Sequence, residues 1–433
     1  MHLKHLFIFS LLFTVIFSVK AQSPKSYNIV IKGGHVIDPK NNINTLMDIA
    51  IKDGKVAMIA KNIDASEAIQ VVNAKGMYVT PGLIDIHVHF FWGHDGESYM
   101  NAPASLPADG FTFPAGVTTV VDAGSPGWKT FELYKKQTID KSQTRVLAFL
   151  NIVGQGMAGG KYENDINEMD SQKAAEMAKK YPKEIVGFKL AHFNGRTWVP
   201  TDRLMEAGKS ANLPVIVDFG GASPFLPLDS LFNVKFRPGD IYTHAFGGNG
   251  STSPNGRESI VDVTTNKVKP FVIKAQNRGV IFDVGFGGSS FLFNQGTPAI
   301  KSGFYPNSIS TDLHTGSMNN AMKSMPNIMS LFMAMGMDLQ SVIKASTWNP
   351  AQHIRRPELG HLTVGAEADV AIFTLREGTF GFYARDGKIA GKNRLETEMT
   401  IRGGSIVYNL NAIAEPNILP SVPRTRPARP ASN

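Results

Sequence analysis

The 433-residue sequence contains no cysteine. This absence excludes a disulfide framework, a thiolate metal site, an iron–sulfur cluster and a cysteine nucleophile. Any metal ion would have to be held by histidine, carboxylate or a less usual ligand. Charged residues are also few, at 18%, whereas hydrophobic residues make up 42%. This balance excludes a wholly disordered chain and allows a large buried core.

The sequence also lacks the strong basic excess of a nucleic-acid-binding protein. The formal net charge is +8, but two units come from residues 1–21 and two from residues 413–433, so that +4 remains between them. Such a charge is ordinary for a chain of this length, and no basic helix or stripe of lysines with interleaved aromatics occurs. The composition therefore argues against a nucleic-acid partner.

Long hydrophobic runs are missing except near the amino terminus. Residues 1–21 combine a basic start with an apolar run at 6–19 and end in small residues at cleavage spacing. This pattern predicts a cleavable signal peptide, because a membrane span needs ~20 apolar residues. No cysteine follows for lipid attachment, so we expect a secreted or periplasmic protein without a membrane span. Residues 413–433, rich in proline and arginine, are expected to be disordered.

Two kinds of pattern divide the rest of the chain. Residues 22–80 and 357–412 consist of short alternating runs broken by glycine, which predict strands and hairpins. Residues 81–356 contain eight apolar runs at a spacing of about 32 residues, the repeat of a βα unit. The runs are 84–89, 118–122, 146–151, 185–189, 215–218, 241–244, 280–283 and 309–312, and helical segments between them include 171–181, 201–212, 269–278 and 327–336.

We therefore predict an α/β protein in which a (β/α)8 TIM barrel carries a small β-sandwich domain built from both chain ends. A doubly wound open sheet is the alternative architecture. It has no support from a glycine-rich phosphate-binding fingerprint, which the sequence lacks.

Polar residues end every predicted barrel strand. The active site of a TIM barrel forms at these carboxyl ends. His87 and His89 are two apart on one strand and share a face, so both can bind one metal ion, and residues from other strands can reach the same point. The strand ends are His87 and His89, Asp122, Asn151, Lys189, Asp218, His244, Asp283 and Asp312. Such nitrogen and oxygen ligands suit Zn²⁺, with Mn²⁺, Co²⁺ or Fe²⁺ as alternatives.

Lys189 is an unusual residue for such a position, because a protonated amine repels a metal ion. It could pair with a carboxylate. Alternatively, burial near a cation favours the neutral amine, which can react with CO₂. The resulting carbamate is an anion whose two oxygens can bridge two metal ions.

Several segments resemble the amidohydrolase superfamily: TPGLIDIHVH at 80–89, GFKL at 187–190, YTHAF at 242–246, STDLH at 310–314 and GAEADVAIF at 365–373. VDAGSPG at 121–127 and RVLAFLNI at 145–152 look like its deacetylase and dihydroorotase-like branch. The resemblance covers residues 27–410. It implies one metal ion on His87, His89 and Asp312, a second on His244, and carboxylated Lys189 as the bridge.

Two positions depart from this family pattern. The fifth strand usually supplies a histidine to the second metal, whereas this chain has Asp218, which could ligate directly or leave the second site weak or empty. We therefore expect one or two metal ions per chain, with Asp218 as a ligand. Phe286 stands where near relatives are expected to carry histidine, which puts the substrate contacts of its loop in doubt. His94 and His314 are further candidates for substrate contact, and His192 could support the site or lie at the surface.

These features predict a hydrolase that cleaves an amide bond in a small molecule, most simply an N-acyl amino acid, by means of a metal-bound hydroxide. Asp312 is expected to carry the proton from water to the leaving group. The alternatives are an esterase for acetylated hydroxy acids, a cyclic amidase, and a ligand-binding barrel without catalysis. The sequence leaves the oligomeric state open, although relatives in this superfamily often form homo-oligomers.

Overall fold

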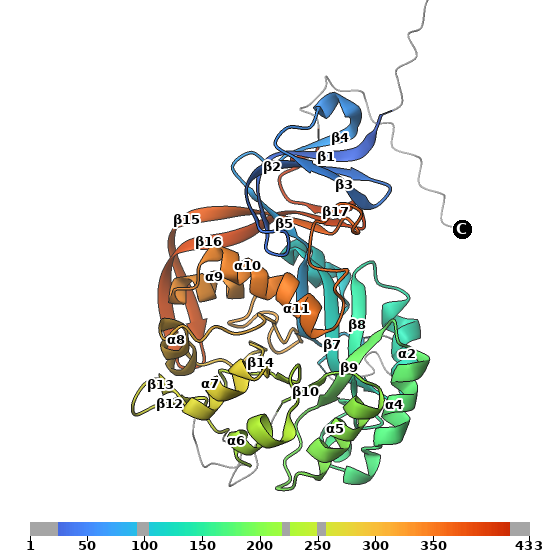
Figure 1. The fold of residues 1–433 in the computed structure, drawn as a ribbon, viewed down its shortest axis with the longest axis vertical. Helices are drawn as coiled ribbons and strands as arrows, with labels where there is room; N and C mark the ends of the chain where they lie inside the picture. Colours follow the sequence, from blue (N-terminus) through green and yellow to red (C-terminus); the bar gives the residue numbers. More distant parts are fainter. Residues whose placement is uncertain (1–24, 93–103, 219–225, 249–256, 416–433) are drawn as a thin grey trace, which may run out of the picture.

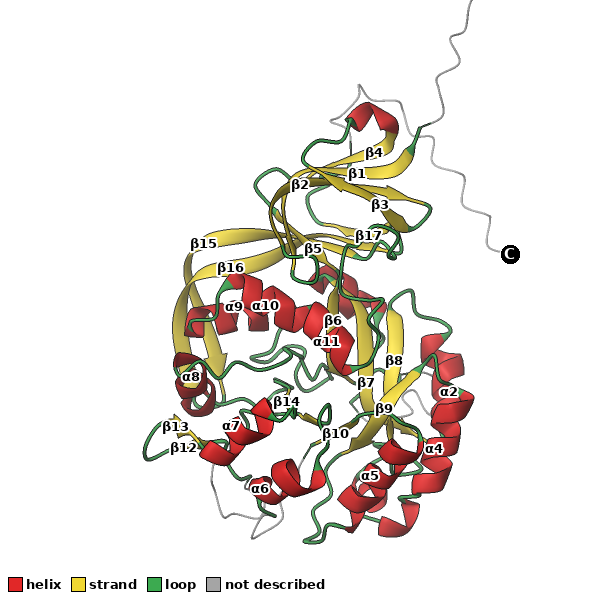
Figure 2. Cartoon of the chain, viewed as in Figure 1, coloured by secondary structure: helices red, strands yellow, loops and turns green. Residues whose placement is uncertain are grey.

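The computed structural model describes residues 25–92, 104–218, 226–248 and 257–415 (Figures 1 and 2). The predicted signal peptide and most of the predicted disordered tail therefore lie outside the described residues. The fold is mixed α/β, with one sheet made by both ends of the chain and a second, parallel sheet surrounded by helices. Within the described ranges, every helix is too short or too polar to cross a membrane.

The terminal sheet joins strands from both ends of the chain. Eight strands pair in the order β17–β16–β15–β5–β1–β2–β3, with β4 paired to β1. The two ends meet where β5 runs antiparallel to β15, with Val79 opposite Ile372. The strands are β1 (Tyr27–Asp38), β2 (Ile43–Lys52), β3 (Lys55–Ala60), β4 (Ala68–Asn73), β5 (Tyr78–Pro81), β15 (Val370–Ala384), β16 (Gly387–Arg402) and β17 (Ser405–Asn409).

The predicted small β domain from both chain ends is present, and it is built as one eight-stranded sheet that curls on itself. Val56 in β3 exchanges backbone hydrogen bonds with Gly365 and Ala366, just before β15, so the sheet bends back on itself. Apolar side chains from both ends, such as Ile51 and Ile401, then share one core. The curl supplies the buried interior that a second layer would otherwise provide.

The barrel sheet is parallel, and its strands are neighbours in chain order. It contains β6 (Leu83–Val88), β7 (Val117–Gly127), β8 (Arg145–Asn151), β9 (Ile185–Leu190), β10 (Val215–Val217), β11 (Ile241–Tyr242) and β14 (Ile281–Phe282), and a separate hairpin is formed by β12 (Val261–Asp262) and β13 (Lys267–Val268). One apolar cluster takes side chains from each of β6 to β11 together with α11 (Trp348–His353). Residues from six neighbouring strands can meet only inside the curl, so this cluster fills the barrel.

The eighth predicted strand, 309–312, is not a regular strand. Residues 308–313 instead close the ring through isolated parallel bridges, from Asp283 to Ser308 and from Val88 to Leu313. The amide of Thr311 donates to the side chain of Asp85, and the neighbouring Asp312 has a φ of 51°. A strand ladder cannot continue through these two residues. A loop therefore closes the barrel.

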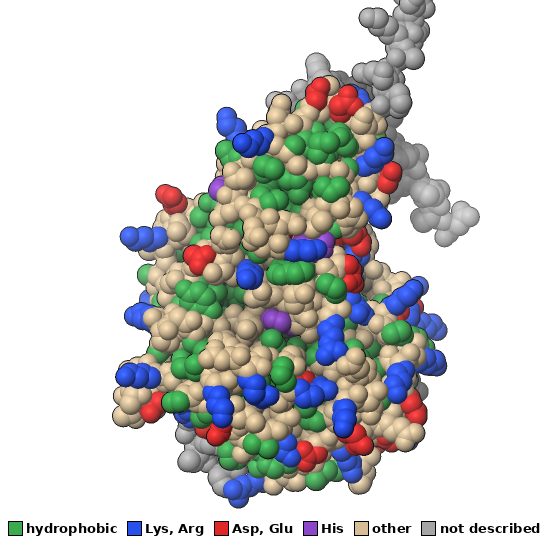
Figure 3. Space-filling view, in the orientation of Figure 1, with side chains coloured by type: hydrophobic (Ala, Val, Ile, Leu, Met, Phe, Trp, Pro, Cys, Tyr) green, Lys and Arg blue, Asp and Glu red, His purple; other side chains and the backbone are tan. Residues whose placement is uncertain are grey.

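Helices cover the outside of the barrel, and the four predicted segments are helical as α4, α5, α7 and α9 (Figure 1). The helices are α1 (Asp109–Thr112), α2 (Phe131–Tyr134), α3 (Gly160–Glu163), α4 (Ser171–Lys180), α5 (Val199–Ser210), α6 (Leu228–Ser230), α7 (Pro270–Asn277), α8 (Phe293–Lys301), α9 (Met325–Met335), α10 (Leu339–Ser346) and α11. On the face in Figure 3, lysine and arginine side chains are spread over the barrel and the terminal sheet rather than gathered in one stripe.

Gly116 lies where the barrel meets the terminal sheet. It has a φ of 75°, and a β-carbon at this position would lie 2.8 Å from the ring of Phe373 in β15. We expect Gly116→Ala to lower the free energy of unfolding by about 2–5 kcal/mol, because left-handed strain and overpacking both apply. Denaturant unfolding measures the loss.

Gly76 provides the matched control. Its φ is 79°, but no atom lies within 4 Å of a β-carbon placed there. Gly76→Ala should therefore cost only the backbone strain, about 1–2 kcal/mol. Equal losses in the two variants would show that the contact with Phe373 contributes nothing.

Candidate active site

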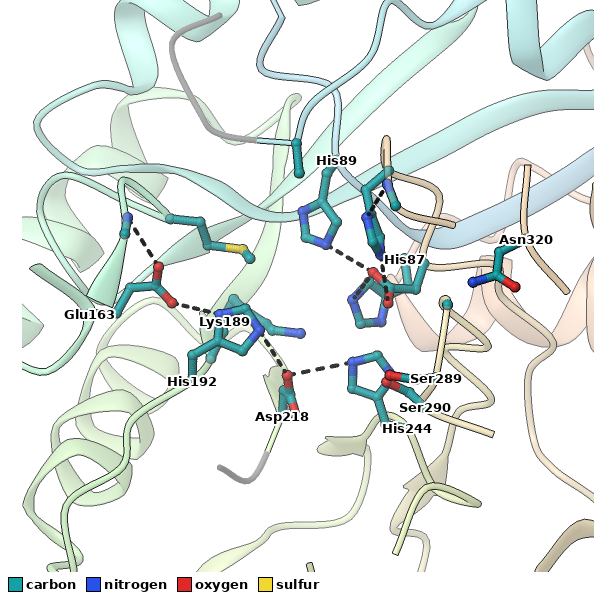
Figure 4. A pocket seen from close by; sticks show the side chains of 18 of the residues that line it. His87, His89, Glu163, Lys189, His192, Asp218, His244, Ser289, Ser290 and Asn320 are labelled. Carbon is teal, nitrogen blue, oxygen red and sulfur yellow. Dashed lines mark hydrogen bonds and ion pairs between the residues drawn. The ribbon is translucent and has the colours of Figure 1, made fainter. Parts of the chain in front are cut away.

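A cavity of about 520 Å³ opens at the carboxyl ends of the barrel strands (Figure 4). It is of the size that binds small molecules. The cavity brings together all six predicted metal ligands and His314. The six are His87, His89, Lys189, Asp218, His244 and Asp312. The barrel therefore assembles side chains that are up to 225 residues apart in the sequence.

Two histidines direct the same ring nitrogen at Asp312. The Nε2 atoms of His87 and His89 lie 3.5 Å and 3.1 Å from Asp312 Oδ1. His87, His244 and Asp312 each offer a ligand atom, and the three atoms lie within 4.8 Å of one another. This is the spacing of ligands around one metal ion, with bonds of ~2.0–2.2 Å.

In His244 and His89, the ring nitrogen that points away from the cluster, Nδ1, contacts another group. His244 Nδ1 lies 2.5 Å from the carbonyl oxygen of Gly285, which can only accept, so Nδ1 donates and Nε2 is the nitrogen that faces the cavity. His89 Nδ1 lies 3.0 Å from the hydroxyl of Ser125. Such outer hydrogen bonds orient metal-binding histidines. The residues present therefore fit a divalent metal ion at this point.

Thr243 fixes His87 in the same way. Its hydroxyl donates to Asp283 over 2.7 Å, which leaves its oxygen to accept from His87 Nδ1, also at 2.7 Å. We expect Thr243→Val to weaken metal binding by about 10–100-fold, because His87 loses its orienting partner. Competition with a chelator measures this affinity.

Thr112→Val is the control for this variant. Thr112 is also buried, and its hydroxyl pairs with Thr144 at 2.7 Å, but it does not line the cavity. Its substitution should leave the metal affinity unchanged. If both variants weakened binding equally, the effect would be a general loss of stability.

Three polar residues that line the cavity hold an uncommon backbone conformation. His192, His244 and Asp312 have φ values of 55°, 52° and 51°. Residues other than glycine adopt this region rarely, at a cost of about 1–3 kcal/mol, and such strain gathers at functional sites. For this reason the predicted strand at 241–244 ends at Tyr242.

Asp312 is a carboxylate in this surrounding. Burial alone raises the pKa of its carboxyl group, but His87, His89 and His244 outweigh burial and hold the pKa far below its usual range. Its second oxygen, Oδ2, lies 3.7 Å from His314 Nε2, so His314 lies beside the site.

Lys189 is 1% exposed and projects from β9 into the cavity (Figure 4). Burial lowers the pKa of its amine, although Asp218, Asp312 and Asp283 act in the opposite direction. A β-carbon on Gly124, whose φ is 94°, would lie 2.7 Å from Lys189 Cγ, so this glycine makes room for the lysine stem. Carboxylation of Lys189 stays a prediction.

Asp218 is surrounded by cationic and imidazole groups. Its Oδ2 lies 3.5 Å from His244 Nε2 and also 3.5 Å from His192 Nε2. Its Oδ1 lies 2.8 Å from the guanidinium of Arg257. Burial alone raises the pKa of Asp218, but Arg257 and His244 outweigh it and hold the pKa well below its usual range. His192 Nδ1 in turn lies 2.6 Å from buried Glu163.

No pattern in the sequence pointed to Arg257 or Glu163. Both lie outside the predicted strands, Arg257 in a loop and Glu163 at the end of the short helix α3, and only folding brings them to Asp218 and His192. Phe286 was a candidate for substrate contact. It is 2% exposed, stacks on Phe291 and is not among the described residues that line the cavity. Its apolar ring belongs to the core. His94 lies outside the described residues.

The other polar residues at strand ends, Asp122, Asn151 and Asp283, form buried hydrogen bonds and do not line the cavity. Asp122 accepts from the amides of Phe90 and Ser125, and Asn151 donates to the carbonyl of Gly124. Asp283 accepts three hydroxyl groups, those of Thr243, Ser308 and Ser310. A polar residue at a strand end was therefore buried and hydrogen-bonded in each of these cases. The sequence pattern did not distinguish these residues from those that line the cavity.

The histidine and carboxylate cluster at the carboxyl ends of a parallel barrel defines a metal-dependent hydrolase. Residues 297–407 match the Amidohydrolase family. A deacetylase of Brucella anthropi is 31% identical over 351 residues, which cover 79% of this chain and 83% of that relative. The chain belongs to the amidohydrolase family, as its motifs predict, and acts on C–N bonds.

Solved structures share the architecture. An adenine deaminase has a TM-score of 0.78 and 27% identity, covering 88% of this chain and 100% of its own. A dihydroorotase has a TM-score of 0.75 and 26% identity, covering 88% of this chain and 99% of its own. The curled parallel sheet described above is therefore the barrel of this family, which excludes the doubly wound alternative.

Proposed function

We propose that the protein removes the acyl group of an N-acyl amino acid. The observation that carries this proposal is the orientation of the histidines, whose outer nitrogens are held by Thr243, Ser125 and Gly285 while the inner ones face a carboxylate. The likeness to a deacetylase supports an acyl amide as the substrate.

His87, His89 and Asp312 would hold the metal ion, with carboxylated Lys189 beside them. A divalent cation there, most simply Zn²⁺, supplies a Lewis acid for the substrate carbonyl and lowers the pKa of water. Asp312 accepts the proton of the attacking water and delivers it to the leaving nitrogen. Its Oδ2, which faces His314 at 3.7 Å, is the oxygen available for this transfer.

The remaining wall of the cavity is suited to a polar substrate. Ser289, Ser290 and Asn320 line it and offer hydroxyl and amide groups, across the cavity from Glu163 and His192 (Figure 4). Such groups can hydrogen-bond the acyl oxygen and the carboxylate of an N-acyl amino acid. The Michaelis complex would be fixed by these side chains, while Asp312 performs the proton transfer.

A matched substrate set tests the proposal. We expect N-acetyl amino acids to be hydrolysed with a kcat/KM at least ~10-fold above that of the corresponding acetylated hydroxy acids and cyclic amides. Release of the free amine gives the rate. A preference for the ester or the ring would assign one of those activities instead, and tight binding without turnover would indicate a ligand-binding barrel.

The amino-terminal leader supports export as part of this proposal. Processing by a signal peptidase would begin the mature chain near Gln22. Sequencing the amino terminus of the protein recovered from the periplasm or medium tests this step. Recovery of the unprocessed chain from the cytoplasm alone would contradict it.

A further inference from the structure

The residues around Asp218 do not fit the second metal site that the family resemblance implies. Among the described residues, the group of three that could hold a metal ion is His87, His244 and Asp312. This group includes His244, the residue expected to serve the second metal. His244 is thus already within ligand distance of the first centre, which leaves Asp218 and its neighbour His192, 3.5 Å away, as the candidates for a second one.

Asp218 already has a cation. Arg257 lies 2.8 Å from its Oδ1, while the aspartate is 1% exposed and the arginine 22% exposed. A guanidinium stays protonated at any pH that the protein meets, and it has no lone pair with which to bind a metal. A divalent ion on Asp218 would therefore sit close to a fixed positive charge in a buried, weakly screened environment.

We propose that Arg257 is the second cation of this active site and that the chain binds one metal ion rather than two. The guanidinium neutralises the charge of Asp218, as a bound metal ion would. This inference rests on the proposed function only for the metal ion held by His87, His89 and Asp312. Arg257 is a positioning residue, since it acts on the site through Asp218.

Metal content per chain tests the inference directly. The full-length chain, produced with excess zinc and bicarbonate, is expected to hold one equivalent by elemental analysis. Arg257→Met should raise this to about two, because Asp218 loses its partner and the repelling charge is gone. Two equivalents in the unsubstituted protein would overturn the inference, and so would one equivalent in folded Arg257→Met.

Two further variants separate the charge of Arg257 from the stability of the fold. Arg257→Lys keeps the positive charge and should keep one equivalent. Arg237→Met removes a comparable ion pair, Arg237 with buried Asp240 at 2.7 Å, away from the cavity, and should also keep one. A second equivalent in either variant would contradict the role of Arg257. If Arg257→Met fails to fold, the unsubstituted chain and Arg257→Lys still decide.

The outcomes also distinguish this inference from the proposed function. A chain that holds no metal at all would overturn the proposed hydrolysis and the inference together. A chain that holds two and hydrolyses N-acyl amino acids would overturn the inference and leave the proposed function standing.

Discussion

Asp312→Asn is expected to lower kcat by about 10²–10⁴-fold, the range of a positioned acid–base group. Asparagine preserves the shape of the side chain and one oxygen near His87 and His89, which lie 3.5 Å and 3.1 Å from Oδ1 in the native protein. It cannot accept a proton from water. The loss should therefore appear in kcat, with a smaller change in KM. Steady-state kinetics on an N-acetyl amino acid measure both constants.

Metal content and thermal unfolding must be measured on the same sample, because a lost metal ion would also abolish turnover. Asp109→Asn provides a control. Asp109 accepts hydrogen bonds from Gln143 and Thr144 and lies outside the cavity, so its variant should keep full activity. Unchanged hydrolysis in metal-replete Asp312→Asn would exclude Asp312 as the proton carrier.

Lys189→Met is expected to lower kcat at least ~100-fold and to abolish any dependence on bicarbonate, as a lost group of the metal environment does. Methionine has a similar length and volume but cannot form a carbamate. In the native protein, burial moves the pKa of Lys189 in the direction that favours the reactive neutral amine. Assays with and without bicarbonate, after removal of CO₂, measure the effect.

Lys323→Met is the matched control for Lys189→Met. Burial also lowers the pKa of Lys323, but this lysine lies over the ring of Tyr383 at 4.6 Å and does not line the active-site cavity. Its substitution should leave activity and bicarbonate dependence intact. Carbon-13 spectra after labelling with ¹³CO₂ should show one carbamate in the native protein and none in Lys189→Met. An unlabelled, CO₂-independent native enzyme would show that Lys189 is not carboxylated.

The barrel could be predicted because its strands carry a local signal. Apolar runs at a regular spacing, such as 146–151 and 185–189, indicate buried parallel strands whatever their partners are. The same argument predicted a strand at 309–312, where the structure has a loop. There, side chains compete with the backbone, since Thr311 bonds to Asp85 over a separation of 226 residues.

The residues of the site that end barrel strands were predictable because the strands themselves could be recognised from the sequence. A barrel places all strand ends at one edge, so Lys189, His244 and Asp312 had to meet once the strands were recognised. Arg257 lies in a loop and Glu163 ends the short helix α3, and the path of both segments depends on contacts that no spacing in the sequence reveals. The ion pair of Arg257 with Asp218 could therefore be recognised only in the folded structure. This ion pair changes the expected number of metal ions.

The loop that closes the barrel also has a consequence for folding. Residues 308–313 complete the ring and carry Asp312, while His89 stands 223 residues earlier in the chain. Contacts of such high sequence separation form late, after a large loss of chain entropy. A chain in which the ring is still open has no complete set of ligands. Tight metal uptake during refolding would thus report the last step of assembly, and metal would preferentially stabilise molecules that have finished folding.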